Sequence, residues 1–402
     1  MDFEPWWLIF VPVLFGLGWL AARFDFRQML SETRNLPDSY FKGLNFLLNE
    51  QPDRAIDAFI EVAKLDPETT ELHFALGSLF RRRGEIERAI RVHQSLLSRE
   101  DLPLGERENA QLELARDFLK AGMFDRAEMG FEAVLPTRHA LDALRALIRI
   151  HESEHNWPRA IEAVQQLHAR VQEPVPQLAH YHCEQACVFL EAHPALIDEA
   201  DRALDAAENA ARQTGGSPAS VARIHMLRAE WAVAQGDLEG QRASLSAVLD
   251  RAPEFAGLIA QPLLECFTAL GRAQEGLELL LLQYRAQPTL DLFNVVFRAL
   301  RTQQGPARAW VFAREVLRAH PSLLGLDRLL EVELAQGESA TSDGLVPGAD
   351  LGLLRSLIHK HSQRLDRYAC SQCGFEARRF YWQCPGCNVW ETYRPRRLEE
   401  LQ

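Results

Sequence analysis

Four of the chain's seven cysteines lie close together near the C-terminus, in the stretch CSQCGFEARRFYWQCPGC. Two residues separate the cysteines within each pair and ten separate the pairs, a spacing typical of two knuckles that present four sulfur ligands to one metal ion. The glycines beside the pairs permit tight turns in which backbone amides can bond to thiolate sulfur. The sequence therefore predicts a metal site formed by Cys370, Cys373, Cys384 and Cys387.

Both zinc and iron accept this set of ligands, because a rubredoxin iron centre also uses four cysteines on two knuckles. Structural zinc is the favoured interpretation, since four sulfurs close the coordination sphere and leave no position for a substrate. A rubredoxin-type electron carrier is the alternative. So small a knot cannot bury all of its aromatic side chains, so some are expected to pack on another part of the chain or on a partner. They are Phe375, Phe380, Tyr381, Trp382 and Trp390.

A second motif, His151-Glu152-Ser153-Glu154-His155, matches the H-E-x-x-H pattern of zinc proteases, in which two histidines one helical turn apart bind the metal. The stretch His155-Asn156-Trp157-Pro158 is instead typical of a turn between two helices. The first helix is therefore expected to end before the second ligand, and the motif is interpreted as a coincidence within a repeat.

His180, Cys183 and Cys187 share one face of a predicted helix and offer a further set of metal ligands. Buried packing is the preferred interpretation for them and for Cys266, because free cysteine is among the most buried residue types. The chain also lacks the sequence signatures of a phosphate-binding loop and of a nucleophile elbow. We therefore predict that it is not an enzyme.

A period of 34 residues runs through the middle of the chain: Gly43 recurs as Gly77, and Ala55 as Ala89. This is the tetratricopeptide period, in which small residues let the two helices of a pair approach closely. The pattern predicts a solenoid of about eight helix pairs, whose first helices line a curved groove suited to peptides or protein partners. A passive spacer is the alternative. The pattern continues through Ala115, Phe118, Ala127, Phe131, and the closing prolines Pro253, Pro288 and Pro321.

The N-terminal segment Trp6–Ala22 carries no charge over seventeen residues, which as a helix at about 1.5 Å per residue nearly spans a bilayer. Acidic residues precede it and no cleavage pattern follows, so a single transmembrane anchor is predicted rather than a signal peptide. Basic residues lie only on its C-terminal side, which places the rest of the chain in the cytoplasm. That reducing compartment also suits four free thiolates.

The chain has 402 residues and a net charge of −12, which gives no basic face of the kind that nucleic acid requires. Arginines 378, 379, 394, 396 and 397 stand among glutamates and predict a solvated or partner-facing surface. The predicted fold class is all-α: a transmembrane helix, a tetratricopeptide superhelical solenoid and a small rubredoxin-like zinc ribbon. The predicted order is an anchor (1–22), a juxtamembrane segment (23–36), the solenoid (37–336), a linker (337–349), a connecting helix (350–366) with Asp350 as its N-cap, and the ribbon with its tail (367–402).

This arrangement resembles the bacterial lipopolysaccharide assembly protein B (LapB/YciM) family over essentially the whole chain. The likeness is sharpest in GLNFLLNEQPDRAIDAF, in LGSLFRRRGEIERAIRVHQSLL and in the cysteine stretch. The resemblance gives Cys370, Cys373, Cys384 and Cys387 the family's metal-ligand role. It implies an inner-membrane adaptor without catalysis of its own, which helps the membrane protease FtsH degrade the LpxC-type deacetylase that commits cells to lipid A synthesis. It also implies an inner-membrane regulator that senses lipopolysaccharide and restrains the adaptor. A homodimer stays open as an alternative to a monomer.

Overall fold

The computed structural model describes residues 51–65, 70–171, 174–337 and 347–401, together with six single residues between 19 and 49. The predicted transmembrane anchor and juxtamembrane segment lie outside these residues except for Trp19, as does most of the predicted linker. Among the residues that are described, none of the helices has the length and apolar character needed to cross a membrane. The chain divides into two compact units, Met1–Ile150 and His151–Gln402.

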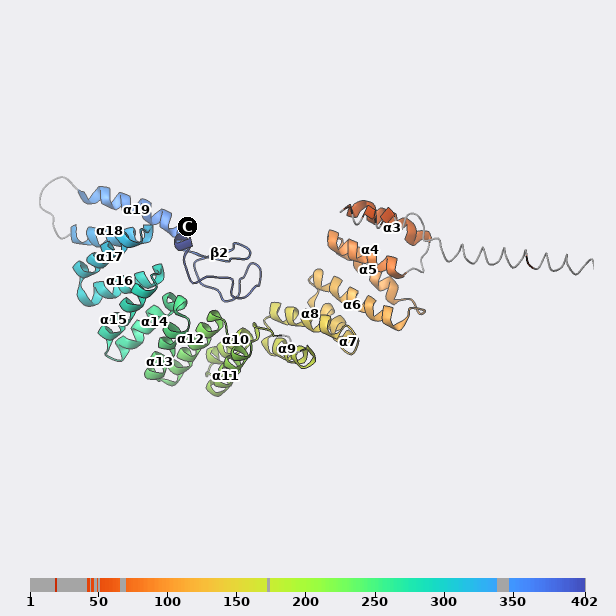
Figure 1. The fold of residues 1–402 in the computed structure, drawn as a ribbon, viewed down its shortest axis with the longest axis horizontal. Coiled ribbons are helices and arrows are strands. Elements are labelled where there is room, and N and C mark those ends of the chain that lie inside the picture. Colours follow the sequence, from red (N-terminus) through yellow and green to blue (C-terminus); the bar gives the residue numbers. More distant parts are fainter. Residues whose placement is uncertain are drawn as a thin grey trace, which may run out of the picture. The chain divides into compact units, whose positions relative to one another are not determined.

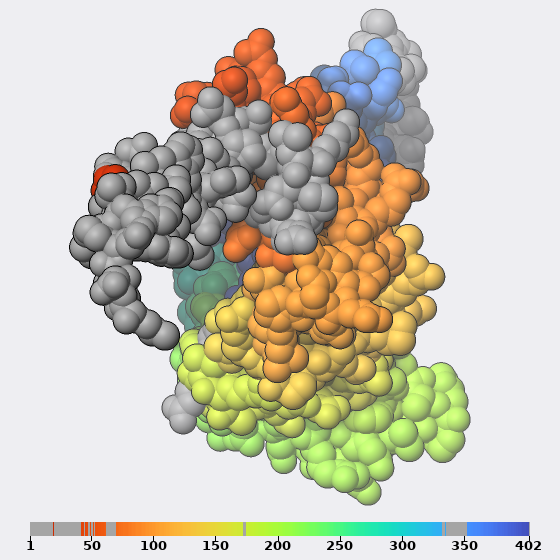
Figure 2. Space-filling model, turned by 90° about the vertical axis from the view of Figure 1, so that its right-hand side faces the viewer, coloured from red at the N-terminus to blue at the C-terminus, as the bar shows by residue number. Residues whose placement is uncertain are grey.

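The first unit is a stack of helices, most of which pack on the next one along the chain. Figure 1 shows the order of these helices, and Figure 2 shows them as successive layers from orange to yellow. Buried small and aromatic residues at the predicted repeat positions form the core, among them Ala55, Ala89, Ala127 and Phe131. The helices are α3 (Pro52–Leu65), α4 (Thr70–Arg83), α5 (Ile86–Leu97), α6 (Leu104–Lys120), α7 (Phe124–Val134) and α8 (Ala140–Ser153), whose last three residues belong to the second unit.

The recurring glycines are required because a neighbouring ring fills the space of a missing side chain. A Cβ at Gly43 would lie 2.6 Å from the ring of Phe59, and one at Gly77 would lie 2.3 Å from Nε2 of His93. The ring of His93 is fixed from its other side, since Nδ1 lies 2.5 Å from the buried carboxylate of Asp117. The predicted role of the small residue, to let the two helices of a pair approach, is confirmed.

We expect Gly77→Ala to destabilise the first unit by about 1–3 kcal/mol, the usual effect of overpacking a well-filled core. The imidazole of His93 cannot move aside without losing its contact with Asp117. Amide hydrogen exchange in α4 and α5 measures the effect. Gly105→Ala, in the first turn of α6, is the matched control, because its nearest neighbour is the flexible end of Arg138 at 3.6 Å. Equal exchange rates in both variants would contradict the steric argument.

The second unit continues the same repeat. Its helix pairs meet at Pro253, Pro288 and Pro321, where the sequence predicted that units end. Pro253 opens the short 3₁₀ helix η2 (Pro253–Phe255), and the other two prolines lie in short loops between helices. The helices are α9 (Trp157–Val171), α10 (Leu178–Glu191), α11 (Ile197–Gln213), α12 (Pro218–Gln235), α13 (Leu238–Arg251), α14 (Ala256–Ala269), α15 (Ala273–Ala286), α16 (Leu290–Gln304), α17 (Pro306–Ala319) and α18 (Leu323–Gly337).

The connecting helix α19 (Pro347–Leu365) packs on α18. It begins at Pro347, so the prediction that Asp350 caps it is wrong. Proline is well suited to the first helical position, where its missing N–H would have had no partner within the helix. The buried carboxylate of Asp327 on α18 holds α19, since it accepts from Arg355 Nε at 3.3 Å and lies 3.2 Å from His359 Nδ1.

The last segment, residues 367–401, forms the ribbon. Strand β1 (Tyr368–Ala369) pairs antiparallel with β2 (Glu376–Ala377), and isolated bridges join Cys370 to Tyr393 and Gln383 to Trp390. A short 3₁₀ helix, η3 (Leu398–Leu401), follows. The described chain is therefore a helical solenoid followed by a small ribbon, as the sequence predicted.

Candidate metal centre and the ribbon interface

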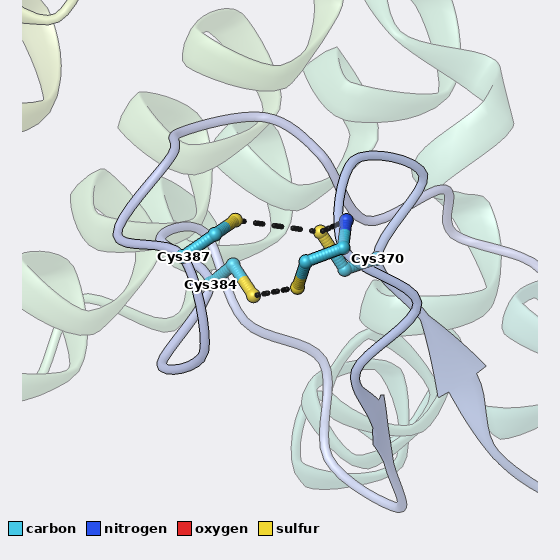
Figure 3. A group of neighbouring side chains, drawn as sticks. Cys370, Cys384 and Cys387 are labelled. Carbon is cyan, nitrogen blue, oxygen red and sulfur yellow. Dashed lines mark hydrogen bonds between the residues drawn. The ribbon is translucent and has the colours of Figure 1, made fainter. Parts of the chain in front are cut away.

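The four clustered cysteines lie together at the end of the ribbon. Their sulfur atoms all lie within 4.8 Å of one another, with Cys370 Sγ 3.8 Å from Cys387 Sγ and Cys373 Sγ 3.6 Å from Cys384 Sγ. Figure 3 shows one pair of sulfurs from each knuckle facing the other pair. Among the described residues, this is the group of side chains that could hold a metal ion.

Each knuckle is built from a left-handed turn that directs amide groups toward sulfur. Gly374 has φ 76° and Asn388 has φ 56°, so the two turns end on residue types that tolerate this conformation. The amides of Gln372 and Gly386 point at the sulfurs of Cys370 and Cys384, with N–S distances of 3.4 and 3.3 Å. Because an amide hydrogen bond favours the charged form of its acceptor, these turns stabilise thiolates.

Two of the sulfurs have pKa values shifted in opposite directions. Burial opposes ionisation of Cys370, but hydrogen bonds from Thr392 and from the amides of Cys373 and Gln372 lower its pKa to about 6. A backbone amide at Val389 favours the thiolate of Cys387, yet burial and the neighbouring sulfurs raise its pKa to about 12. Four thiolates this close repel one another, and a bound divalent ion would offset that repulsion.

The donor set fits a tetrahedral ion with no further ligand. Cys370 and Cys384 are buried and Cys373 is exposed, so one edge of the centre faces solvent. Four sulfur donors suit zinc or iron and provide no position for a substrate. With zinc the site could stabilise the fold of the ribbon, and with iron it could also carry one electron.

The ribbon is packed against the solenoid of the second unit through its tryptophans. The ring of Trp390 stacks on His180 with centroids 4.9 Å apart, and it meets Trp157 edge-on at 6.1 Å. Trp382 stacks on Phe255 at 5.6 Å. Trp390 also donates its Nε1 hydrogen to Glu152, a residue of the H-E-x-x-H motif. The prediction that part of the ribbon's aromatic set packs elsewhere is confirmed, while Phe375 and Tyr381 stay exposed.

Ion pairs and hydrogen bonds fix the ribbon on the same surface. Glu391 Oε1 lies 2.7 Å from His180 Nε2 and accepts from the hydroxyl of Ser217 at 2.5 Å. Arg397 donates to both carboxylate oxygens of Asp291, at 2.7 and 3.0 Å. The carboxylate of Glu399 accepts from the amide of Leu323, at the start of α18.

The partners of these polar contacts come from the first helix of successive pairs. Glu152 belongs to α8, His180 to α10, Asp291 to α16 and Leu323 to α18, while Ser217 is the N-cap of α12. First helices line the concave side of a tetratricopeptide solenoid. Figure 1 shows the ribbon on the inner side of the arc that α10 to α18 form. The groove of the second unit is thus occupied by the chain's own ribbon.

Acid should weaken this interface. Burial lowers the pKa of His180 below its ordinary 6.5, so the interface favours the neutral ring; nearby Arg223 acts in the same direction, and Glu391 and Glu184 oppose it. Burial opposes ionisation of Glu391, but hydrogen bonds from His180 and Ser217 lower its pKa below 4.5. For both side chains the pKa is lower when the ribbon is bound than when the chain is unfolded. Each group therefore contributes its full stabilisation of the interface above its unfolded pKa, and this contribution is lost as the pH falls through its folded pKa.

We therefore expect binding of the ribbon to be complete above about pH 6.5 and to weaken progressively from there to below about pH 4.5. Acrylamide quenching of the interface tryptophans measures it, with metal content determined at each pH. His180→Gln should flatten the upper part of the profile and leave the fall below about pH 4.5 that belongs to Glu391. An unchanged profile in His180→Gln would show that this contact does not set the pH dependence.

The other candidate metal ligands in the sequence are the H-E-x-x-H motif and the set of His180 and nearby cysteines. The H-E-x-x-H motif does not form a metal site: α8 ends at Ser153, and His155 lies in the following turn with φ 54°. Cys183 and Cys266 are buried as predicted, whereas Cys187 is only half-buried. The interpretation of His180 as a packing residue is wrong in part, because it is buried against the ribbon and lies at hydrogen-bonding distance from Glu391. No sequence signal pointed to that pair, whose partners are 211 residues apart.

The fold and site define a tetratricopeptide solenoid that carries a rubredoxin-type ribbon. Residues 42–101 match the tetratricopeptide repeat family, and residues 368–395 match a family described as a rubredoxin metal binding domain. Lipopolysaccharide assembly protein B of Escherichia coli K12 is 30% identical over 390 residues, covering 96% of this chain and 97% of that protein. The Haemophilus influenzae protein of the same name is 26% identical over 399 residues, with the same coverage. The chain belongs to the lipopolysaccharide assembly protein B family.

Proposed function

We propose that this protein is a non-enzymatic, inner-membrane adaptor that regulates lipopolysaccharide synthesis. In this proposal it promotes FtsH-dependent proteolysis of the LpxC-type lipid A deacetylase, its client, and an inner-membrane regulator that senses lipopolysaccharide restrains it. The observation that carries the proposal is the full-length match to relatives named for lipopolysaccharide assembly. A helical scaffold with a ribbon held in its groove suits the presentation of one protein to another.

The uncharged N-terminal segment supports the proposed location. Residues 1–22 would anchor the chain in the inner membrane by a single pass, with the solenoid and ribbon on the cytoplasmic side. This position would place the client beside a membrane protease. The solenoid and the exposed side of the ribbon would hold the client.

We propose structural zinc at Cys370, Cys373, Cys384 and Cys387, where it would fix the shape of the ribbon and therefore of its interface with the solenoid. An electron carrier with iron at these sulfurs is the second candidate, favoured by the exposed edge at Cys373. Protein purified anaerobically from native cells distinguishes them. A colourless protein with about one zinc per chain supports the structural role, whereas a visible thiolate-to-iron band that bleaches reversibly on reduction supports the carrier.

The half-life of the deacetylase tests the adaptor role. In native cells, after protein synthesis is blocked, depletion of this protein should lengthen that half-life several-fold. Restoring the wild-type chain should return it to its original value. An unchanged half-life on depletion would refute the adaptor role and leave the family membership intact.

A further inference from the structure

The ribbon carries more arginines than acidic side chains. Residues 367–402 contain six arginines and four glutamates, in a chain whose net charge is −12. All four glutamates have partners: Glu376 pairs with Arg367 at 3.4 Å, Glu391 with His180, Glu399 with the start of α18, and Glu400 accepts from the amide of residue 397 at 2.8 Å. No glutamate of the ribbon is left to pair with the remaining arginines.

Two of the six arginines are paired with carboxylates and four are not. Besides the Arg367 pair, Arg397 is held by Asp291 and Asp366. The other four are exposed, and none makes a salt bridge to a carboxylate of the described chain, although Arg396 lies near enough to Glu400 to favour its charged form. We call these four the arginine face: Arg378, Arg379, Arg394 and Arg396.

Two of these exposed arginines follow residues that are paired within the ribbon. Arg378 follows Ala377, which pairs with the buried Tyr368, and Arg394 follows the buried Tyr393, which bridges to Cys370. Arg397 donates to the carbonyl of Arg378 at 3.1 Å, so the two segments that carry the four arginines lie side by side. Exposed Tyr381 is part of the same ribbon, and its ring lies 6.0 Å from the ring of Tyr393.

We propose that the arginine face binds an acidic segment of a partner protein. Arginine presents a planar set of donors that matches a carboxylate in two parallel hydrogen bonds. Arginine and tyrosine are also the residue types enriched where proteins meet. The face is rigid because the ribbon beneath it is anchored through Trp390, Glu391 and Arg397. This inference does not depend on the proposed protease or its client.

A polypeptide fits this position better than the other anions. The ribbon lies on the inner side of the arc formed by α10 to α18, where a flat bilayer would have to follow a concave surface (Figure 1). Nucleic acid is disfavoured by the charge of the chain, which is negative in total and acidic outside the ribbon. An extended acidic segment can enter a concave surface and pair with several arginines at once.

A fluorescein-labelled peptide of twelve residues, four repeats of Asp-Glu-Gly, tests the proposal by fluorescence anisotropy against the full chain in a neutral detergent. We expect binding that weakens with salt and falls about tenfold or more in the quadruple variant R378E/R379E/R394E/R396E. The quadruple glutamine variant should give an intermediate loss. Zinc content and tryptophan fluorescence confirm that the ribbon stays folded in each variant.

The matched control is R285E/R298E/R308E/R318E, which alters the net charge equally through exposed arginines of α15, α16 and α17. We expect it to change binding less than about twofold, because a docking surface is local whereas non-specific attraction follows net charge. Equal losses in both quadruple variants, or no binding of the peptide, would overturn the proposal. It would also fail if dihexanoylphosphatidylglycerol micelles, and not the peptide, bound through these arginines, or if light scattering showed that a second copy of the chain occupied them.

Discussion

Replacing Cys370 and Cys384 together by serine is expected to release the bound metal, unfold the ribbon and uncover the groove of the second unit. These are the two buried cysteines of the centre, one on each knuckle. Serine leaves only two sulfurs, too few to close the coordination of zinc or iron. Binding of structural zinc in small domains contributes on the order of 10 kcal/mol to folding, more than the short strands of this ribbon can supply without it.

The readouts are metal content by mass spectrometry and hydrogen exchange in the second unit. Exchange should rise in the ribbon and also in α10, α12 and α16, whose polar groups the ribbon contacts. Cys187→Ser is the control, since this half-buried cysteine lies on α10 outside the centre. A double variant that still holds one metal ion per chain and keeps its exchange protection would show that these sulfurs are not the ligands.

Features that depend on nearby residues could be predicted from the sequence. Gly77 and Ala89 lie where the two helices of one pair pack closely, and the spacing of the cysteines reflects a turn of only a few residues. The prolines between pairs mark breaks that local stereochemistry imposes. In each case the interacting residues belong to one or two neighbouring elements, so the pattern can be recognised in a single sequence.

The position of the ribbon on the solenoid could not be predicted. Its contacts join residues that are far apart in the sequence and are not related by the repeat. Trp390 and Glu152 are 238 residues apart, and Arg397 and Asp291 are 106 apart. An excess of aromatic residues in the ribbon showed that a second surface was needed but did not identify it. The start of α19 was missed for another reason: two local signals competed, and proline at position 347 outweighed the capping preference of Asp350.

The second large effect is expected from Trp390→Ala, which should detach the ribbon from the solenoid without unloading its metal. The indole is 7% exposed, lies over His180, contacts Tyr181 edge-on at 6.0 Å and donates to Glu152. Truncating a buried tryptophan typically costs about 3–5 kcal/mol, and here the loss falls on the interface. The four sulfurs belong to the knuckles and not to this ring, so metal binding should persist.

Two measurements on Trp390→Ala separate attachment of the ribbon from its folding. Chelator competition should show a metal affinity within a few-fold of the wild type, while protease cleavage near residue 366, between α19 and the ribbon, should become much faster. Tyr381→Ala removes an exposed ring of the same ribbon and should change neither. If the metal affinity collapsed as well, Trp390 would belong to the core that folds the ribbon. If cleavage stayed slow, the contacts of Arg397 and Glu399 would suffice to hold the ribbon in the groove. The ribbon would then be attached mainly by charged groups rather than by aromatic packing.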